Sequence, residues 1–549
     1  MIDGFTINVK DYGAVGDGVT DDTVSLQAAF DAGAGQLTVL EPGATYKCTS
    51  QLHIKGNVDG NGATLEFYGA AISYLVYQDT MGSLRNFTID GDNVSSCQAG
   101  LQVDTDFEFA GYCNYDLIVK NISNSNNTQG CSGAQFFKSS SATHLDSYLD
   151  VKIQVINVVA TANGIIGDTG GKASGIIVGF NAAGTNSNIV IHDCNIETIS
   201  SGGVDPAEDA DGIQLLITGF ASTKLGLYEI KNCVVKDSKK RGFKIQAANA
   251  FIENCVCYGQ NTLAGFETYA LDTTFLNCKY LAGTGVSFTT SIANSKFIGC
   301  YAEGSGATLD LVRVYGNGDY ATFENCTFIS SAAYATGDFG VMRIYEADNV
   351  RLIACTLRHT NNQGCSLLIR EPAIAIVDNC IFEGSLTGIN LWQSTGRITI
   401  SDSVISATTA CLSRAASTSQ EVYVRDTRLF SSSAGTVCDL WNSAGANSAY
   451  AELNNCTILS TGAGGAWVQA ESRITNCRIV NGGAQAGVGI YFPGNASVAR
   501  NNQIQNFTTG ILSTFGTNQE IADNVTITCV TPYDLTSSTP LVNTDNFSR

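Results

Sequence analysis

One short pattern recurs between residues 194 and 524 and constrains the fold more than any other feature of the chain. It reads apolar, any residue, Asn or Asp, Cys, any residue, apolar, with clear copies starting at Ile230, Phe323, Val377 and Ile474. The anchor, usually Cys, lies at positions 194, 233, 255, 278, 300, 326, 355, 380, 403, 427, 456, 477, 502 and 524, about 25 residues apart. Such a period indicates a solenoid, and period-two alternation rich in Ile, Val, Phe and Thr indicates strands. The pattern predicts an all-β chain, a parallel β-helix with one coil per repeat.

The register within a coil follows from the same pattern. The Asn or Asp before the anchor is expected at a bend, because its short side chain tolerates left-handed backbone and bonds locally. A second strand of the form Gly, apolar, any residue, apolar follows, with copies starting at Gly212, Gly242, Gly265 and Gly388. Its alternation predicts that Ile213, Ile245 and Leu391 point inward while Gln214, Lys244 and Asn390 point outward.

Composition fits a solenoid. A chain of 549 residues is too long for one ordinary core, whereas a coil contacts only its neighbours. The sequence has 57 Gly for turns but only 6 Pro, which a sheet excludes. About half of the 19 Cys occupy one equivalent inward position, so we expect a stack of reduced, structural thiols and not disulfides.

The opening segment resembles a known family. Asn8–Thr23 reads as a strand, a Gly-rich turn, and then Thr20–Asp22 capping a short amphipathic helix that carries Leu26 and Phe30. This segment closely resembles the start of the pectate-lyase-like superfamily, as found in bacteriophage tailspikes and polygalacturonase-related proteins. The resemblance implies a right-handed parallel β-helix with an N-terminal capping helix, and we interpret the acids of the segment as structural.

The predicted organisation has three parts. Residues 1–35 form the strand, turn and capping helix, and residues 36–530 form the β-helix, irregular over 36–190 and regular over 191–530. Residues 531–549 are expected to be a polar, extended tail. Long Ser/Asn/Gly-rich loops in the irregular coils are places where binding surfaces are often built.

Outward residues of the Gly-led strand should form columns, because equivalent residues of neighbouring coils lie about 4.8 Å apart. The first predicted column is Gln214, Lys244, Glu267, Ser287, Arg313, Arg343, Leu368 and Asn390. The second is Leu216, Gln246, Tyr269, Thr289, Tyr315, Tyr345, Arg370, Trp392 and, further on, Trp441. Glu346 and Glu371 follow at equivalent positions of successive coils, about one strand spacing apart.

These columns indicate a sugar-binding groove. Charged residues are only 15% of the chain but concentrate here, beside aromatic rings that suit pyranose faces. We interpret Glu346 and Glu371 as a catalytic pair. The substrate-binding candidates on these columns are Lys244, Glu267, Arg313, Tyr315, Arg343, Tyr345, Arg370 and Trp392. The alternative is a solvated sheet face with ordinary ion pairs between coils.

A second cluster combines acids and bases. Asp209 and Asp211 precede one Gly-led strand, and Lys240 and Arg241 precede the next, so they should face each other across one coil. Ala210-Asp211-Gly212 is similar to part of the polygalacturonase Asn-Thr-Asp-Gly motif, although no Gly-His-Gly or Arg-Ile-Lys signature follows. Asp209 and Asp211 are the alternative catalytic pair, with Lys240 and Arg241 as substrate-binding residues; the other interpretation is an ion-pair ladder.

Together these features, with the family resemblance, predict a tailspike-like depolymerase of a bacterial surface polysaccharide, acting by glycoside hydrolysis. One alternative is β-elimination on a uronate, with Lys244, Arg313 or Arg343 as the cation and Tyr345 as base or acid. Another is a non-catalytic carbohydrate-binding spike or adhesin.

Partners and location are expected as follows. The resemblance implies a homotrimer on a virion tail, with Leu368 and Val341 as outward apolar residues between chains. Met1–Gly4 does not begin a signal peptide, and no apolar run is long enough to span a membrane. The net charge of -20 disfavours nucleic acid as a partner. The four His lack metal-site spacing, so we expect no metal and no cofactor.

Overall fold

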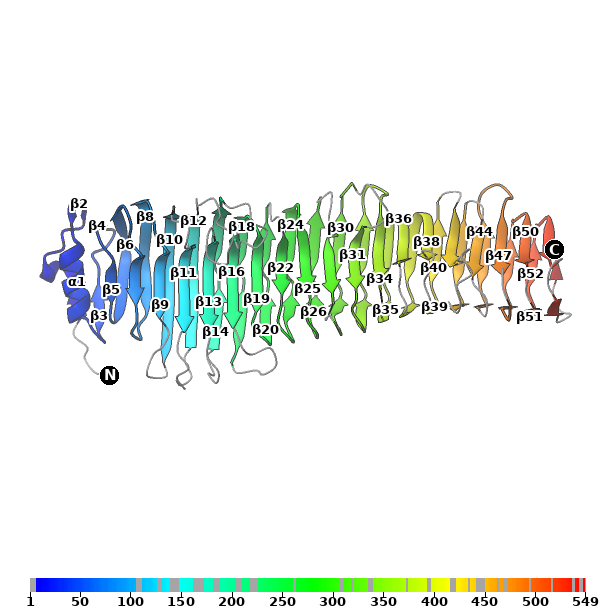
Figure 1. Cartoon of the computed structure of the whole chain (residues 1–549), viewed down its shortest axis with the longest axis horizontal. Helices are drawn as coiled ribbons and strands as arrows, with labels where there is room; N and C mark the ends of the chain where they lie inside the picture. The colour runs from blue at the N-terminus through cyan, green and yellow to red at the C-terminus, as the bar shows by residue number, and fades with distance from the viewer. Residues whose placement is uncertain are drawn as a thin grey trace. The chain divides into compact units, whose positions relative to one another are not determined.

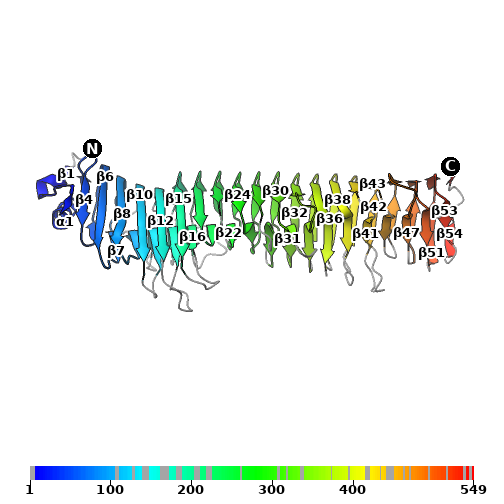
Figure 2. The same cartoon turned by 90° about the horizontal axis from the view of Figure 1, so that it is seen from above.

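In the computed structural model the chain divides into two units, Met1–Gly285 and Val286–Arg549. We describe each unit separately. The described residues are 6–104, 111–125, 130–138, 148–160, 172–180, 188–202, 210–217, 226–259, 263–305, 310–316, 319–333, 339–371, 374–392, 396–414, 421–432, 435–440, 450–461, 464–468, 472–492, 495–514, 517–535, 539–542 and 547–548. Within each unit, parallel strands of successive coils stack on one another (Figures 1 and 2). This is the predicted parallel β-helix.

Unit 1 begins with a cap made of β1 (Thr6–Asn8), the 3-10 helix η1 (Val9–Tyr12), β2 (Asp17–Asp21) and α1 (Thr23–Ala32). Leu26, Ala29 and Phe30 of α1 are buried, as expected for an amphipathic helix covering the first coil. Asp22 is the N-cap residue of α1, within the predicted Thr20–Asp22 cap, but its side chain makes no capping hydrogen bond. Its carboxylate instead accepts hydrogen bonds from Val15 N (2.6 Å) and Gly16 N (3.0 Å), so it holds the Gly-rich turn closed.

The coils of unit 1 form three stacks of parallel strands. Sheet A contains β1, β3 (Leu37–Val39), β6 (Asn57–Gly69), β8 (Leu84–Val94), β10 (Tyr112–Asn124), β12 (Tyr148–Ala160), β14 (Asn188–His192), β17 (Tyr228–Lys231), β20 (Ala250–Glu253) and β23 (Thr274–Leu276). Sheet B contains β2, β4 (Thr45–Cys48), the second halves of β6, β8, β10 and β12, then β15 (Asn195–Ser201), β18 (Val234–Ser238), β21 (Val256–Tyr258) and β24 (Lys279–Gly283). Sheet C contains β5 (Leu52–Ile54), β7 (Tyr74–Gln78), β9 (Ala99–Asp104), β11 (Cys131–Lys138), β13 (Ala173–Phe180), β16 (Ala210–Ile217), β19 (Arg241–Gln246) and β22 (Ala264–Thr268).

Unit 2 repeats the three-sheet arrangement. Sheet A contains β26 (Lys296–Ile298), β29 (Thr322–Glu324), β32 (Val350–Ile353), β35 (Ile374–Asp378), β37 (Arg397–Ser401), β39 (Glu421–Arg425), β42 (Ala451–Asn454), β45 (Arg473–Thr475), β48 (Val498–Arg500), β51 (Thr517–Ala522) and β54 (Thr539–Val542). Sheet B contains β27 (Tyr301–Gly304), β30 (Thr327–Ser330), β33 (Thr356–His359), the start of β36 (Ile381–Trp392), the start of β38 (Val404–Arg414), β40 (Arg428–Ser431), β43 (Thr457–Ser460), β46 (Arg478–Asn481), β49 (Gln503–Gln505), β52 (Val525–Ile527) and β55 (Phe547–Ser548). Sheet C contains β25 (Val286–Thr290), β28 (Val312–Tyr315), β31 (Gly340–Tyr345), β34 (Cys365–Arg370), the ends of β36 and β38, β41 (Thr436–Leu440), β44 (Gly464–Val468), β47 (Val488–Phe492), β50 (Thr509–Ser513) and β53 (Thr531–Asp534).

The C-terminal segment contains strands that the sequence did not indicate. Strands β53, β54 and β55 lie beyond residue 531, where the sequence predicts only an extended polar tail. Residues such as Pro532 and Leu541 therefore continue the stacking, because the last coils need strand partners for their backbone groups.

The bend before each anchor has the predicted left-handed backbone. All fourteen residues that precede an anchor lie at φ between +50° and +62°. Most are Asn or Asp, and neighbouring bend side chains bond each other, as between Asn254 Nδ2 and Asn232 Oδ1 (3.4 Å) and between Asn501 Nδ2 and Asn476 Oδ1 (3.3 Å). Ala354, at φ +52°, is an exception that carries a Cβ in this region without a polar side chain.

The anchors themselves form an inward stack, and 18 of the 19 Cys are buried. The Cys233 thiol donates to the carbonyl of Lys231 two residues earlier (3.2 Å), and the same contact recurs along the stack. Where Cys is replaced, Ser403 Oγ and Thr427 Oγ1 make this contact with Ser401 O and Arg425 O at 2.7 Å. The anchor position therefore favours a small side chain with a weak donor, which confirms that the cysteines are structural.

Candidate active site

The predicted columns are present on sheet C of unit 2. Strand pairing places Arg313 opposite Arg343, Tyr315 opposite Tyr345, Tyr345 opposite Arg370, and Arg370 opposite Trp392. One step of the predicted alignment is wrong, because Thr289 and not Ser287 pairs with Arg313. An error of two residues in the register does not change which side chains face outward, because side chains alternate between the two faces of a strand. Only the pairing of β25 with β28 differs from the prediction, and Trp441 lies outside the described residues.

A pocket of about 330 Å³ opens among these columns. Phe339, Arg343, Leu368, Arg370 and Trp392 line it. Leu368 is 2% exposed and Val341 is fully buried, so the prediction that these two residues face a neighbouring chain is wrong. Leu368 instead forms part of the pocket, which combines apolar surface with two guanidinium groups.

A buried carboxylate that the sequence prediction missed holds the arginines. The side chain of Asp310 has no exposed surface; its Oδ2 lies 3.3 Å from Arg313 Nε and 3.1 Å from Arg343 Nε, and its Oδ1 accepts from Gly340 N at 3.0 Å. Burial raises the pKa of the Asp310 carboxyl, although Arg343, the Gly340 N–H and Arg313 each lower it. Asp310 thus holds Arg343, which lines the pocket, together with Arg313 of the preceding coil.

Aromatic rings order the rest of the column. The guanidinium of Arg370 lies 5.5 Å from the ring centroid of Tyr345, and that of Arg313 lies 5.7 Å from Tyr315. The Tyr315 and Tyr345 rings meet edge to face at 6.1 Å. Such contacts are worth about 0.5–1 kcal/mol each at exposed sites, and here they hold long side chains in one orientation.

Glu346 and Glu371 lie together at the bends that end β31 and β34. Both are at positive φ, +55° and +65°, and their amides donate to Arg370 O and Trp392 O of the next coil, each at 3.3 Å. The Glu346 side chain is exposed, and a hydrogen bond with Glu371 raises the pKa of its carboxyl. Arg370 Nε is 4.0 Å from Glu371 Oε1. The pair therefore contains one carboxyl that favours the protonated form and one beside a positive charge.

The second predicted cluster, on sheet C of unit 1, is largely interior. Asp211 has no exposed side-chain surface, and Arg241 and Glu267 side chains are 10% and 9% exposed. Arg241 Nη1 lies 3.4 Å from Asp211 Oδ1, its Nε bonds Glu267, and its Nη2 lies 3.4 Å from Tyr269 Oη. Burial opposes the charge on Arg241, but Asp211 and Glu267 outweigh it and raise the pKa of the guanidinium. This geometry is that of the ion-pair ladder, and it leaves these three residues little access to a substrate.

The remaining residues of that cluster are dispersed or lie outside the described part of the chain. Lys240 and Lys244 are half-buried, and Lys244 pairs with Glu267 in register as predicted. Asp209 lies outside the described residues. Gln214 Nε2 donates to Asp211 Oδ2 at 2.6 Å, which satisfies the carboxylate a second time. The structure thus brings together Asp211, Arg241 and Glu267, whereas the Asp209 and Asp211 pair stays a prediction.

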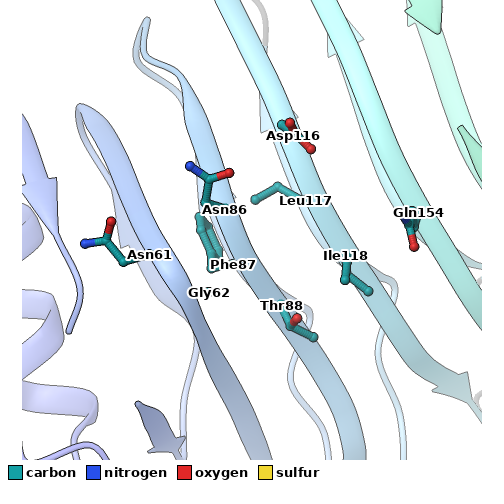
Figure 3. A pocket seen from close by; sticks show the side chains of 9 residues that line it. All are labelled: Asn61, Gly62, Asn86, Phe87, Thr88, Asp116, Leu117, Ile118 and Gln154. Atoms are coloured by element: carbon teal, nitrogen blue, oxygen red, sulfur yellow. The ribbon is translucent and has the colours of Figure 1, made fainter. Parts of the chain in front are cut away.

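Other pockets have a different character. In unit 1, a pocket of about 450 Å³ is lined by residues of β6, β8, β10 and β12, including Asn61, Asn86, Asp116 and Gln154 (Figure 3). Asp116 is its one carboxylate and is paired with Lys152 at 3.2 Å. Amides and a single neutralised acid suit binding better than proton transfer. Among the described residues, no group of three or more His, Cys, Asp and Glu is arranged to hold a metal ion.

Family comparison identifies two matches. Residues 179–405 and 440–547 match the family described as right-handed β-helix region. Residues 6–201 match rhamnogalacturonase A/epimerase, pectate lyase-like. Both agree with the superfamily to which the N-terminal segment is similar.

Individual relatives match only in part. A mannuronan C5-epimerase, AlgE2, of Azotobacter vinelandii is 42% identical over 91 residues, which are 14% of this chain and 9% of the epimerase. AlgE4 of the same organism is 53% identical over 45 residues, 8% of each protein. The chain therefore spans less than a tenth of the length of these curated relatives.

Solved structures match this chain at low identity and low TM-score. The N-terminal fragment of bacteriophage Phi29 gene product 12 is 12% identical at a TM-score of 0.42, covering 95% of this chain and 87% of that one. Tailspike protein 3 of bacteriophage CBA120 is 11% identical at a TM-score of 0.38, covering 83% and 63%. At such values these likenesses carry no weight for function. In the described part of the chain, no helix has the length and apolar character needed to cross a membrane.

Proposed function

Because the chain belongs to the right-handed β-helix family, whose rigid coils hold outward side chains in fixed columns, we propose that it is an enzyme acting on a polysaccharide. The proposed reaction is glycoside hydrolysis at Glu346 and Glu371. The observation that carries the proposal is the contact between these two carboxyls beside a pocket lined by Arg343, Arg370 and Trp392.

The two carboxyls have distinct roles in this proposal. Glu346, whose pKa is raised by Glu371, is the proton donor to the oxygen of the leaving sugar. Glu371 attacks the anomeric carbon as that bond breaks, and water then displaces the enzyme from the sugar with Glu346 accepting its proton. Retaining enzymes hold the two carboxyls about 5 Å apart, close to the spacing of neighbouring coils, so we expect retention of configuration.

The pocket supplies binding. The Trp392 ring offers an apolar face for a pyranose, while Arg343 and Arg370 provide donors for sugar hydroxyls or for an acidic substituent. Asp310 contributes indirectly, since it fixes Arg343 before substrate arrives. Preorganised donors lose less conformational freedom on binding than mobile ones.

Proton abstraction from a uronate is the second candidate, and the short epimerase segments favour it. Both elimination and C5 epimerisation begin by removing the proton next to the sugar carboxylate. Tyr345 is the expected base, yet its hydrogen bond with Glu371 raises the pKa of the phenol. A phenol that stays protonated is a poor base, so we favour hydrolysis.

The test measures three products from one incubation with bacterial capsular and exopolysaccharides. New reducing ends without ultraviolet absorbance indicate hydrolysis, absorbance of an unsaturated uronate indicates elimination, and altered C5 proton signals in NMR indicate epimerisation. Glu346→Gln and Glu371→Gln should each lower turnover by about two orders of magnitude or more. The matched control is Glu383→Gln, which removes an exposed carboxylate on sheet B paired with Arg358 at 3.7 Å. Full activity of both site variants would refute the assignment.

Assembly and location remain proposals that rest on the resemblance of the N-terminal segment. We propose a homotrimer that binds a bacterial surface polysaccharide from a virion tail. Since Leu368 and Val341 are buried, the contact between chains must use other residues. Sedimentation of a stable 57.8 kDa monomer at micromolar concentration would contradict the trimer.

A further inference from the structure

A second pocket of unit 2 lies on a different sheet from the candidate active site. About 470 Å³ in volume, it is lined by residues of β37, β39 and β42 on sheet A, whereas Glu346, Arg370 and Trp392 lie at sheet C. Its lining residues are Arg397, Thr399, Tyr423, Val424, Arg425, Glu452 and Asn454. Neither the repeat pattern nor the proposed hydrolase site accounts for this cluster.

Two tyrosines and two carboxylates form an ordered network there. The rings of Tyr423 and Tyr450 lie 5.5 Å apart, and each hydroxyl donates to a carboxylate of its own strand region: Tyr423 to Glu421 (3.2 Å) and Tyr450 to Glu452 (2.8 Å). Each of these pairs fixes a carboxylate oxygen that can still accept hydrogen bonds on its other lone pairs. Burial and then Glu452 raise the pKa of Tyr450, so its hydroxyl remains a donor.

Arg397 is also part of this network and contacts both Glu421 and Tyr423. Arg397 Nε donates to Glu421 Oε2 (2.9 Å), and Arg397 Nη2 lies 2.7 Å from the same oxygen as an ion pair. The guanidinium lies 5.1 Å from the Tyr423 ring centroid. Register pairing sets Arg397 opposite Glu421, and Tyr423 opposite Glu452. The side chains are therefore fixed by the coil and by each other before any ligand binds.

The chemistry of this surface selects one class of ligand. Arg397 is paired with Glu421, and Arg425 lines the pocket together with Glu452. Arg473 of the next coil lies opposite Glu452 in register. Three arginines thus accompany two carboxylates, and an excess of one charge gives only weak attraction to phosphate or nucleic acid. The pocket's only large apolar surfaces are the tyrosine rings, which suit the face of a pyranose, while carboxylate oxygens and the exposed Arg425 suit its hydroxyls. A docking protein would need a broader apolar patch.

We propose that this surface, made of Arg397, Tyr423, Arg425, Tyr450 and Glu452, is a second, non-catalytic binding site for an uncharged pyranose residue of a polysaccharide. It differs from the pocket on sheet C, whose paired arginines suit acidic groups. A site of this kind holds the polymer on the coil independently of cleavage. Its existence does not depend on the proposed hydrolysis.

The test is affinity electrophoresis of the whole chain in gels containing dextran or galactomannan as uncharged polymers, or alginate as an acidic one. We expect at least one uncharged polymer to retard the protein. Tyr450→Ala and Tyr423→Ala should each weaken that retardation about tenfold in apparent Kd, and Glu452→Gln about threefold. Retardation that survives Trp392→Ala but not Tyr450→Ala is binding at this surface and not at the sheet C pocket.

A matched control tests whether the weaker retardation is specific to this surface or follows from removing any tyrosine on the coils. Tyr301 on sheet B also donates to a carboxylate two residues away, Glu303 (2.9 Å), but lines none of the pockets described above. Tyr301→Ala should therefore bind the polymer like the unmodified chain. If Tyr423→Ala fails to fold, Tyr423→Phe tests the contribution of the hydroxyl alone. The proposal is overturned if neither uncharged polymer retards the protein, or if retardation survives Tyr450→Ala, Tyr423→Phe and Glu452→Gln. Retardation by alginate alone would likewise overturn it.

Discussion

Replacing Ala354 by Asn should stabilise unit 2. Ala354 occupies the bend before Cys355 at φ +52°, between the bends of Asn325 and Asn379 in the adjacent coils. Its amide donates to Asp378 O (2.9 Å) just as Asn325 N donates to Ile353 O (3.0 Å), so the backbone is already the same at all three bends. Only the side chain of Ala354 differs from those of the neighbouring bends.

The expected magnitude follows from two contributions. An L-residue with a Cβ loses roughly 1–2 kcal/mol in the left-handed region, a cost that Asn offsets by local hydrogen bonding. A bond to a neighbouring bend amide adds about 0.5 kcal/mol at this half-buried position. Because part of the strain remains, we expect a net gain of about 1 kcal/mol in the free energy of unfolding. If this contact forms late in folding, unfolding slows about fivefold.

The assay is the unfolding rate in guanidinium chloride, followed by tryptophan fluorescence, since long coils are prone to irreversible unfolding. Asn325→Ala is the reciprocal variant and should accelerate unfolding by a similar factor. Ala354→Gly removes the Cβ without adding an amide, so it should fall between Ala and Asn after the entropy cost of Gly. The reasoning is refuted if Ala354→Asn unfolds as fast as the unmodified chain while Asn325→Ala has no effect.

Three further predictions concern ionisation, thiols and the candidate site. Burial would lower the pKa of His192, but hydrogen bonds to Asp193 and Asp150 outweigh it and raise the pKa, so its stabilising contribution is present below about pH 6.5 and is lost as pH rises through the raised value. Burial lowers the pKa of His359 to about 4, so its neutral form stabilises the fold above about pH 6.5 and that contribution fades towards pH 4; NMR titration of labelled histidines should show these opposite shifts. Thiol titration of denatured, unreduced protein should recover nearly all thiols, and Cys278→Asp should cost several kcal/mol, on the order of a buried unpaired polar group, in a denaturant melt. Asp310→Asn should lower stability by roughly 2–3 kcal/mol and weaken polysaccharide binding, whereas unchanged binding would show that Asp310 does not fix Arg343.

The repeat made the coil and its bends predictable. A residue at the bend must adopt positive φ, which limits the choice to Asn, Asp and Gly in most coils. These residue types therefore recur in the sequence at regular intervals. The same spacing aligned Arg343, Tyr345 and Arg370 correctly, because parallel strands pair in register and alternate strictly between faces.

Features that depend on how deeply a side chain is buried, or that lie in coils of irregular length, were not predictable. Asp310 lies just before β28, outside the alternating strand pattern, and its contacts with Arg313 and Arg343 join two coils. His192 reaches Asp150 (2.6 Å) from 42 residues away, across coils whose lengths vary too much to give a period. A pattern of residue types also cannot separate a solvated ion pair from the buried one at Arg241, because both carry the same alternating charges.

The cysteine stack gives nearly every coil its own internal reporter. Burial raises the pKa of thiols such as Cys194, Cys233 and Cys255, so in the folded chain they are neither exposed nor ionised and react slowly with alkylating reagents. Each becomes reactive only when its own coil opens. Pulsed alkylation read by mass spectrometry would thus show the order in which individual coils separate, with no label introduced and no residue changed.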